Sequence, residues 1–105
     1  MSSYVLSRVA QGDLVEIRDY YLNQSSQRTA RKIIVEFTDA FRLLASNPSL
    51  GHRREDLAES RPVLFWPVRD YLVVYRIKPR AIEVITLVHG FRDVAALLAK
   101  LERRS

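Results

Sequence analysis

The sequence predicts one α+β domain, in which an N-terminal strand and an α-helical hairpin pack on a mostly antiparallel sheet and a C-terminal helix follows. Three observations predict this fold. Two stretches with the period of a helix come first, three short strand-like stretches come next, and the links between those strands are too short for parallel crossovers. The 105 residues are a common size for a single domain, so we expect one domain over residues 1–105.

The first half of the chain carries the two helical stretches. After a short strand at residues 4–6, Ser7 is suited to cap a helix, which the polar stretch at residues 23–27 ends. The helical period returns from Ser26 and stops at Asn47-Pro48. Because the link between the two helical stretches is short, we expect them to form an antiparallel hairpin. The apolar stripes are Ala10, Leu14, Ile17 and Tyr21, then Ala30, Ile33, Ile34, Phe37, Phe41 and Leu44.

The second half changes to the period of a strand. Residues 63–68, 71–78 and 81–89 are rich in β-branched and aromatic side chains, which favours three strands in an antiparallel meander. The middle strand is apolar on both faces, so we expect each face of the sheet to be covered at least in part. Its two faces are Tyr71, Val73, Tyr75 and Ile77 on one side and Leu72 and Val74 on the other. The last helix is expected from Val94, Leu97, Leu98 and Leu101.

The composition is that of a globular protein with an arginine-rich surface. The net charge is +5, and lysine occurs only at positions 32, 78 and 100. Arginine pairs well with phosphates and carboxylates, so this surface predicts a nucleic acid or an acidic protein as partner. A charge of this size is equally compatible with a surface that only keeps the protein soluble.

The residue usage also predicts the compartment. Cysteine is absent, which excludes disulfides and thiolate chemistry and favours the cytoplasm. The sequence has no apolar run that could span a membrane, and its first residues lack the regions of a signal peptide. We therefore expect a cytoplasmic protein with no membrane partner.

No residue pattern predicts a metal or a cofactor. His52 and His89 are far apart in the sequence, and neither has a second ligand at a useful spacing. The three glycines are isolated, so no phosphate-binding loop is expected. The carboxylate pairs are interpreted as solvated surface charge: Asp13 with Glu16, and Glu55 with Asp56.

The remaining candidates for a site are basic. If the strands pair as expected, the end of the last strand could approach the basic loop that precedes the sheet. Such a cluster could cleave RNA without a metal, with His89 moving a proton and arginines stabilising a pentacovalent phosphate. It could equally bind acidic side chains or phosphates without chemistry, and His89 could merely end a strand. The basic residues are Arg53, Arg54, Arg61, Arg69, His89 and Arg92.

The order of short motifs along the chain resembles the ParE branch of the RelE/ParE toxin superfamily. The likeness spans nearly the whole chain, and the motifs are specific through their order and spacing and not singly. The N-terminal half contributes Leu6-Ser7, Ala10, Asp13-Leu14, Ile17, Tyr20-Tyr21, Asn47-Pro48 and Leu50-Gly51. The C-terminal half contributes residues 67–77 (PVRDYLVVYRI), 82–85 (IEVI), 88–93 (VHGFRD) and Leu97-Leu98.

The resemblance implies the toxin of a type II toxin–antitoxin pair, silenced by a cognate antitoxin whose extended tail wraps it. RelE-type members cut mRNA on the ribosome, whereas ParE-type members bind and poison DNA gyrase. RelE-type enzymes typically carry an arginine in a Tyr-Arg-x-x-Tyr stretch, and here Leu72 stands at that position of Tyr71–Tyr75. Many also end in a tyrosine, and this chain has none after Tyr75. The two differences favour gyrase inhibition and growth arrest over RNA cleavage.

The resulting assignment is a ParE-like gyrase inhibitor that works by binding, with no catalytic residue. We expect Arg69, His89 and Arg92 to face the target, and Phe65 and Trp66 either to contact the antitoxin or to belong to the core. Direct nucleic-acid binding is not required. One alternative is a ribosome-dependent endoribonuclease, and another is a non-toxic homologue that only binds its antitoxin. The nuclease would use Arg54, Arg61, His89 and Arg92.

Overall fold

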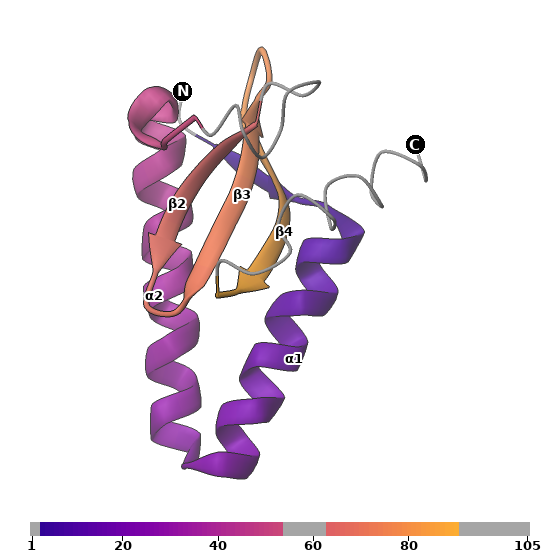
Figure 1. The fold of residues 1–105 in the computed structure, drawn as a ribbon, viewed down its shortest axis with the longest axis vertical. Coiled ribbons are helices and arrows are strands. Elements are labelled where there is room, and N and C mark those ends of the chain that lie inside the picture. Colours follow the sequence, from indigo (N-terminus) through magenta and orange to yellow (C-terminus); the bar gives the residue numbers. More distant parts are fainter. Residues whose placement is uncertain (1–2, 54–62, 91–105) are drawn as a thin grey trace.

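In the computed structural model, the described part of the chain forms two layers, a helical hairpin and a four-stranded sheet (Figure 1). The structure describes residues 3–53 and 63–90. The helix expected after Gly90 lies outside these residues. The elements in chain order are β1 (Tyr4–Leu6), α1 (Arg8–Gln24), α2 (Gln27–Ser46), the short 3₁₀ turn η1 (Pro48–Leu50), β2 (Leu64–Val68), β3 (Tyr71–Ile77) and β4 (Ile82–His89).

A serine caps each helix: Ser7, as predicted, before α1, and Ser26, where the helical period is expected to return, before α2. The Ser7 hydroxyl accepts a hydrogen bond from the Ala10 amide at 3.0 Å, and the Ser26 hydroxyl accepts one from the Thr29 amide at 3.1 Å. Each bond satisfies one of the amides that a helix leaves without an internal partner. The Ser7 hydroxyl also donates to the carbonyl of Ile85 at 2.6 Å, so the start of α1 is tied to β4.

The sheet has the strand order β1-β4-β3-β2. The predicted antiparallel meander of β2, β3 and β4 is confirmed, and β1 pairs parallel to β4. The hairpin is the long connection that carries the chain from β1 at one edge of the sheet to β2 at the opposite edge. The sheet is mixed, and only its shortest strand departs from the antiparallel pattern.

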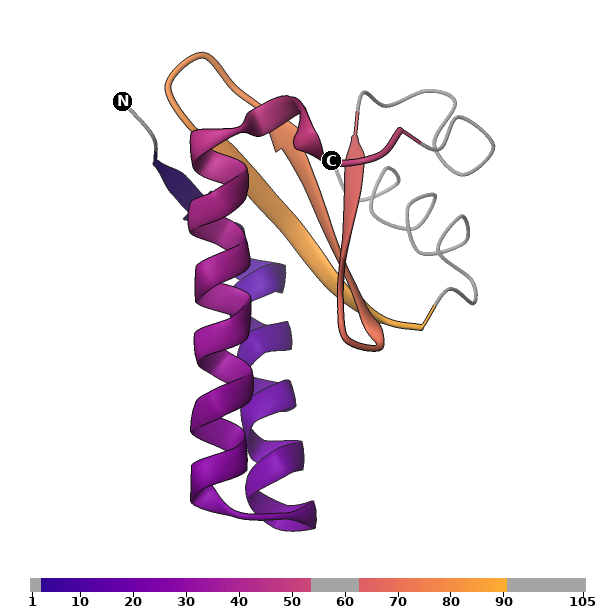
Figure 2. The same ribbon diagram turned by 90° about the vertical axis from the view of Figure 1, so that its left-hand side faces the viewer.

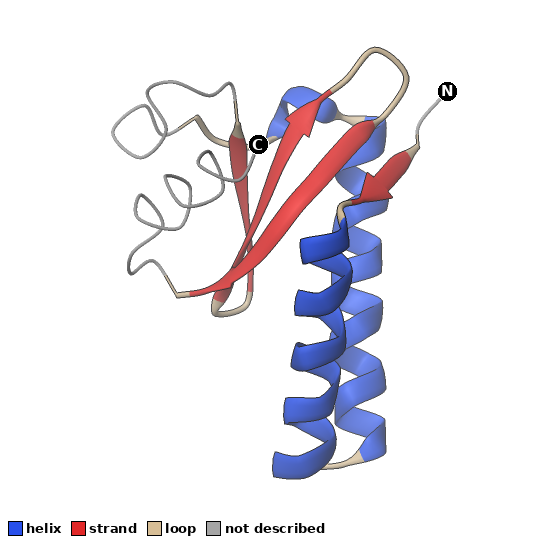
Figure 3. Ribbon diagram, turned by 90° about the vertical axis from the view of Figure 1, so that its right-hand side faces the viewer, coloured by secondary structure: helices blue, strands red, loops and turns tan. Residues whose placement is uncertain are grey.

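The hairpin covers one face of the sheet, and the main core lies between the two layers (Figures 2 and 3). The stripe predicted for α2 is buried except for Ile34, which is half-buried. A second buried cluster lies on the opposite face, which confirms that β3 is apolar on both faces. Its members are Val63, Phe65, Leu72, Val74 and Ile85, with Val88 packed against them.

A tyrosine in the core holds the turn between the layers. Tyr75 is fully buried, and its hydroxyl donates to the Pro48 carbonyl at 2.7 Å and accepts from the Gly51 amide at 2.8 Å. Burial raises the pKa of Tyr75, which keeps the phenol neutral. A Cβ at Gly51 would lie 2.3 Å from this hydroxyl, so only glycine fits there without a shift. Tyr75 thereby fixes the segment that leads towards β2.

Candidate functional site

The expected target-facing residues Arg69 and His89 lie at the same end of the sheet. His89 is the last residue of β4 and stands opposite Tyr71 in the register, with the two rings 4.9 Å apart between centroids. Arg69 begins the two-residue turn between β2 and β3 and has a φ of 55°. The third expected residue, Arg92, lies outside the described residues, as do Arg54 and Arg61 of the nuclease alternative.

Arg69 is occupied by an ion pair with α2. Its Nε and Nη2 atoms donate to the two carboxylate oxygens of Glu36 at 2.9 and 2.7 Å. The hydrogen bond from Arg69 lowers the pKa of Glu36, and the pair is only partly shielded from water. The contact ties the turn to the helix and helps to hold Arg69 in a backbone conformation that is unfavourable for a residue with a side chain. While this pair is intact, another molecule can contact only the donors of Arg69 that Glu36 leaves free.

The basic loop and His89 are not brought together by the described residues. His52 forms an isolated bridge with Phe65, which stands opposite Val74 in β3. His89 stands opposite Tyr71 at the end of the same strand. The part of the loop that the structure describes therefore runs beside the middle of the sheet, and the approach expected from strand pairing is not seen there.

The two candidates for antitoxin contact occupy different environments. Phe65 is only 2% exposed and belongs to the buried cluster on the far face of the sheet. This burial favours the interpretation of Phe65 as a core residue over its interpretation as an antitoxin contact. Trp66 is half-buried, and its ring stacks on His52 with centroids 6.1 Å apart. Trp66 therefore keeps an accessible surface on the outermost strand.

The outer edge of β2 offers few free backbone groups. The amide and carbonyl of Phe65 both pair with His52 at 2.8 Å, and Pro67 has no amide hydrogen to donate. Edge strands are often blocked in such ways, because free edges attract other strands. A partner peptide would find little to pair with along the described part of this edge.

The hairpin carries two grooves on its surface. An apolar groove of about 270 Å³ lies between α1 and α2 near β1, and Leu14, Val15 and Ile34 line it. A second groove of about 570 Å³ lies along the start of α2. Its lining is mainly basic, with Arg28, Arg31 and Lys32 beside the exposed Val35. Sequence reasoning missed both grooves. The first depends on how the two helices pack, whereas the described lining of the second is one face of α2, whose spacing of three and four residues could have revealed it.

Asp13 corrects the interpretation of the acidic pair on α1. It was expected to be solvated charge, yet its Oδ2 atom accepts from the Thr86 hydroxyl at 2.6 Å and from the Leu87 amide at 3.0 Å. Thr86 is 2% exposed and is the one buried polar residue among those described. The carboxylate therefore joins α1 to β4, and no local sequence pattern could reveal a contact across 73 residues.

Within residues 3–53 and 63–90, no group of three or more His, Cys, Asp or Glu residues could hold a metal ion. No helix of that same part is long and apolar enough to cross a membrane.

The comparisons with known proteins agree with this architecture. The model of a family described as the ParE toxin of type II toxin–antitoxin systems, parDE, matches residues 4–94. The fold is also similar to a solved structure described as the chromosomal ParDE TA system from P. aeruginosa, with a TM-score of 0.72 and 20% identity over 87% of this chain and 98% of that one. A search of curated proteins gave no match.

The protein is thus a toxin of the type II toxin–antitoxin class. Because the family model spans most of the chain, the chain belongs to the ParE toxin family. The solved structure supports the fold alone at this level of identity.

Proposed function

We propose that this toxin stops growth by binding DNA gyrase and trapping it on cleaved DNA, and that a cognate antitoxin silences it by covering its surface. Membership of the ParE family supports the proposal. The single observation that carries it is the environment of Leu72.

Leu72 stands where nucleases of the related branch carry an arginine. Its side chain is 4% exposed and packs with Phe65, Val74 and Ile85 on the face of the sheet away from the hairpin. An aliphatic group cannot stabilise the charge that builds on a phosphorane. Because its neighbours are apolar, an arginine at this position would also lack a described partner for its charge. These features support toxicity through association and not through RNA cleavage.

The target-facing residues of this proposal are Arg69 and His89 at one end of the sheet, together with Arg92, which lies outside the described residues. Arg69 offers its whole guanidinium group to the target only when it leaves Glu36. Exchange of this partner is feasible, because an exposed ion pair contributes only about 0.2–1 kcal/mol. Two variants separate the roles of Arg69. Glu36→Gln frees the guanidinium group and should leave toxicity intact, whereas Arg69→Ala should reduce it.

The antitoxin would use the hairpin. An acidic, partly apolar tail matches the two grooves, because it can pair with Arg28, Arg31 and Lys32 while it buries apolar side chains against Val15 and Val35. Trp66 remains a candidate for contact at the edge of the sheet. Charge reversal at Arg31 should weaken antitoxin binding, and the same change at the exposed Arg80 serves as its control.

Expression of the chain without its antitoxin tests the proposal. Gyrase poisoning should arrest growth, induce the DNA-damage response and leave mRNA intact. The nuclease alternative predicts mRNA cleavage that His89→Ala abolishes, with no damage response. The non-toxic alternative predicts normal growth. The last two results would each reject the proposed mechanism, and an adjacent gene for a small DNA-binding antitoxin would fit all three.

A further inference from the structure

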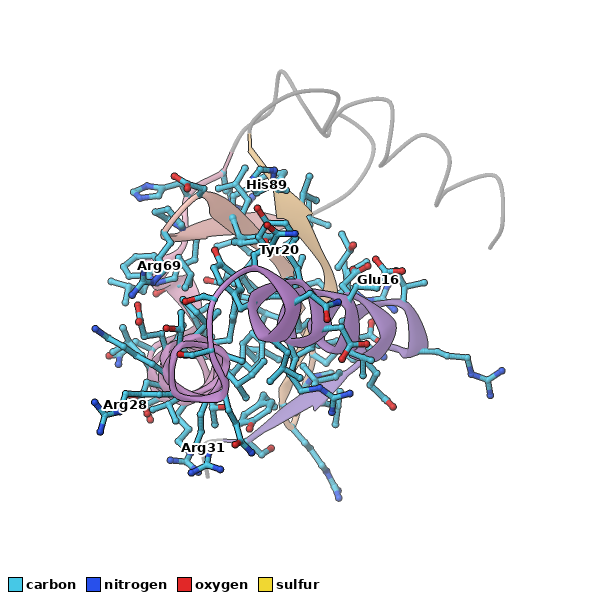
Figure 4. All side chains as sticks on the ribbon, turned by 90° about the horizontal axis from the view of Figure 1, so that it is seen from below. Glu16, Tyr20, Arg28, Arg31, Arg69 and His89 are labelled. Carbon is cyan, nitrogen blue, oxygen red and sulfur yellow. The ribbon has the colours of Figure 1, made fainter. Side chains whose placement is uncertain are left out.

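A cleft of about 570 Å³ lies between α1 and the end of the sheet that carries His89. Its position differs from that of the two hairpin grooves. Figure 4 shows Tyr20 and His89 on one side of the molecule and Arg28 and Arg31 on the opposite side. The walls come from α1 on one side and from the ends of β3 and β4 on the other.

Aromatic rings form much of this cleft. Tyr20 is 55% exposed and packs edge-on against Tyr21, with the ring centroids 5.2 Å apart. Tyr71 is 8% exposed and contacts the His89 ring. An exposed tyrosine ring beside a cleft offers a π face to a ligand, and cations bind such faces well.

The charge of the cleft is opposite to that of the chain. Among the described residues that line it, three carry a carboxylate (Asp13, Glu16 and Asp70) and none is a lysine or an arginine, although the net charge of the whole chain is +5. The Asp13 carboxylate already accepts hydrogen bonds from the Thr86 hydroxyl and the Leu87 amide. The carboxylates of Glu16 and Asp70 make no ion pair or hydrogen bond with the residues that the structure describes. The nearby Arg69 is held by Glu36.

The phenol of Tyr71 also lies in this cleft, and its pKa is raised. Burial, followed by the hydroxyls of Tyr21 and Tyr20 and the carboxylate of Asp70, raises the pKa of Tyr71 to about 12. Burial disfavours any charge at this phenol, and only the Asp70 carboxylate among these causes is charged at neutral pH, so it is the carboxylates of the cleft that favour a positive group.

We infer that this cleft receives an arginine side chain of a partner protein, with the guanidinium group stacked on Tyr20 and paired with Glu16 or Asp70. A planar guanidinium group can stack and donate paired hydrogen bonds together, which an ammonium group does less well. Anionic partners such as nucleic acid or an acidic peptide are disfavoured by the three carboxylates. The inference does not depend on which protein supplies the arginine, so it stands or falls separately from gyrase binding.

A titration of the full chain with a short peptide tests the inference. The probe is acetyl-Gly-Arg-Gly-amide, followed by the amide NMR signals of the isotope-labelled protein. Saturable shifts are expected at cleft residues such as Tyr20, Asp70 and His89. The citrulline peptide has nearly the same shape without the charge, and it should bind more weakly. Because the whole chain is positive, diffuse electrostatics repel the probe, and binding must come from local groups.

Single substitutions then locate the contact. Glu16→Gln, Asp70→Asn and Tyr20→Ala should each weaken binding by about two- to fivefold, as expected for exposed ion pairs and cation–π contacts. Asp39→Asn removes an exposed helical carboxylate outside the cleft and should change nothing. The inference would be overturned if the arginine and citrulline peptides bound equally, or if the shifts were absent, did not saturate or were centred outside the cleft. It would also be overturned if Asp39→Asn weakened binding as much as the cleft variants do.

Discussion

The link between Asp13 and Thr86 gives the sharpest test of how the hairpin is fixed to the sheet. One carboxylate oxygen accepts two hydrogen bonds, from a buried hydroxyl at 2.6 Å and from a backbone amide at 3.0 Å. Thr86→Val keeps the shape of the side chain and removes one donor. Asp13→Ala removes the acceptor and leaves both donors without it.

The magnitude follows from the charge and burial of these groups. A hydrogen bond to a charged group contributes about 1.5–3 kcal/mol, and an unsatisfied buried group costs about 1–3 kcal/mol. We therefore expect Thr86→Val to lower the free energy of unfolding by about 1.5 kcal/mol and Asp13→Ala by about 2–3 kcal/mol. The double variant should lose little more than Asp13→Ala alone, because both single changes break the same bond. The coupling energy should be about 1–2 kcal/mol.

Urea unfolding of the four proteins measures this cycle. Each kcal/mol should also shift the midpoint of thermal unfolding by about 4–8 °C in a domain near this size. Glu16→Ala, one turn further along α1 and exposed, is the control and should change stability by less than about 0.5 kcal/mol. Effects of Asp13→Ala and Thr86→Val that simply add, within about 0.5 kcal/mol, would refute the link.

Three further predictions concern single contacts. Tyr75→Phe should cost about 1–3 kcal/mol in urea unfolding, because the Gly51 amide loses its partner, and a loss near zero would contradict that role. Glu36→Gln should cost less than about 1 kcal/mol at neutral pH. Because the folded pKa of Glu36 is lowered by Arg69, this difference should be present above pH 4.5 and disappear as the pH falls through the folded pKa. The pKa of Tyr71 is raised from 10 to about 12, so its contribution to stability is present below pH 10 and lost as the pH rises towards 12. Tyr71→Phe should remove this alkaline loss, and an unchanged pH profile would count against it.

Local signals predicted the local structure well. Ser7 and Ser26 mark the starts of the helices because capping depends on neighbours three residues away. The alternation of Tyr71, Leu72 and Val73 places them on the correct faces, because successive side chains in a strand point to opposite sides. The resemblance to the ParE branch also rested on the order of motifs, and the family model confirms it.

Contacts between distant segments could not be predicted in this way. From the sequence alone, Asp13 is interpreted as surface charge, and its hydrogen bond with Thr86 becomes visible only when β4 lies beside α1. In the same way, the ion pair of Arg69 with Glu36 becomes visible only when α2 lies beside the turn. The sequence leaves Phe65 open between antitoxin contact and the core, because only the packing on the far face of the sheet shows that it is buried. The apolar groove between the helices and the aromatic cleft likewise arise from packing between elements.

The most direct test of toxicity by association is a titration of the purified chain into gyrase that is acting on plasmid DNA. Binding as the mechanism predicts that cleaved DNA builds up and reaches a plateau once each gyrase binding site is filled. In a parallel reaction with translating ribosomes, the mRNA should remain whole. The opposite result would be cleavage of the transcripts when the toxin is present in far smaller amount than the ribosomes, with gyrase unaffected. That result would show that the chain is a catalyst.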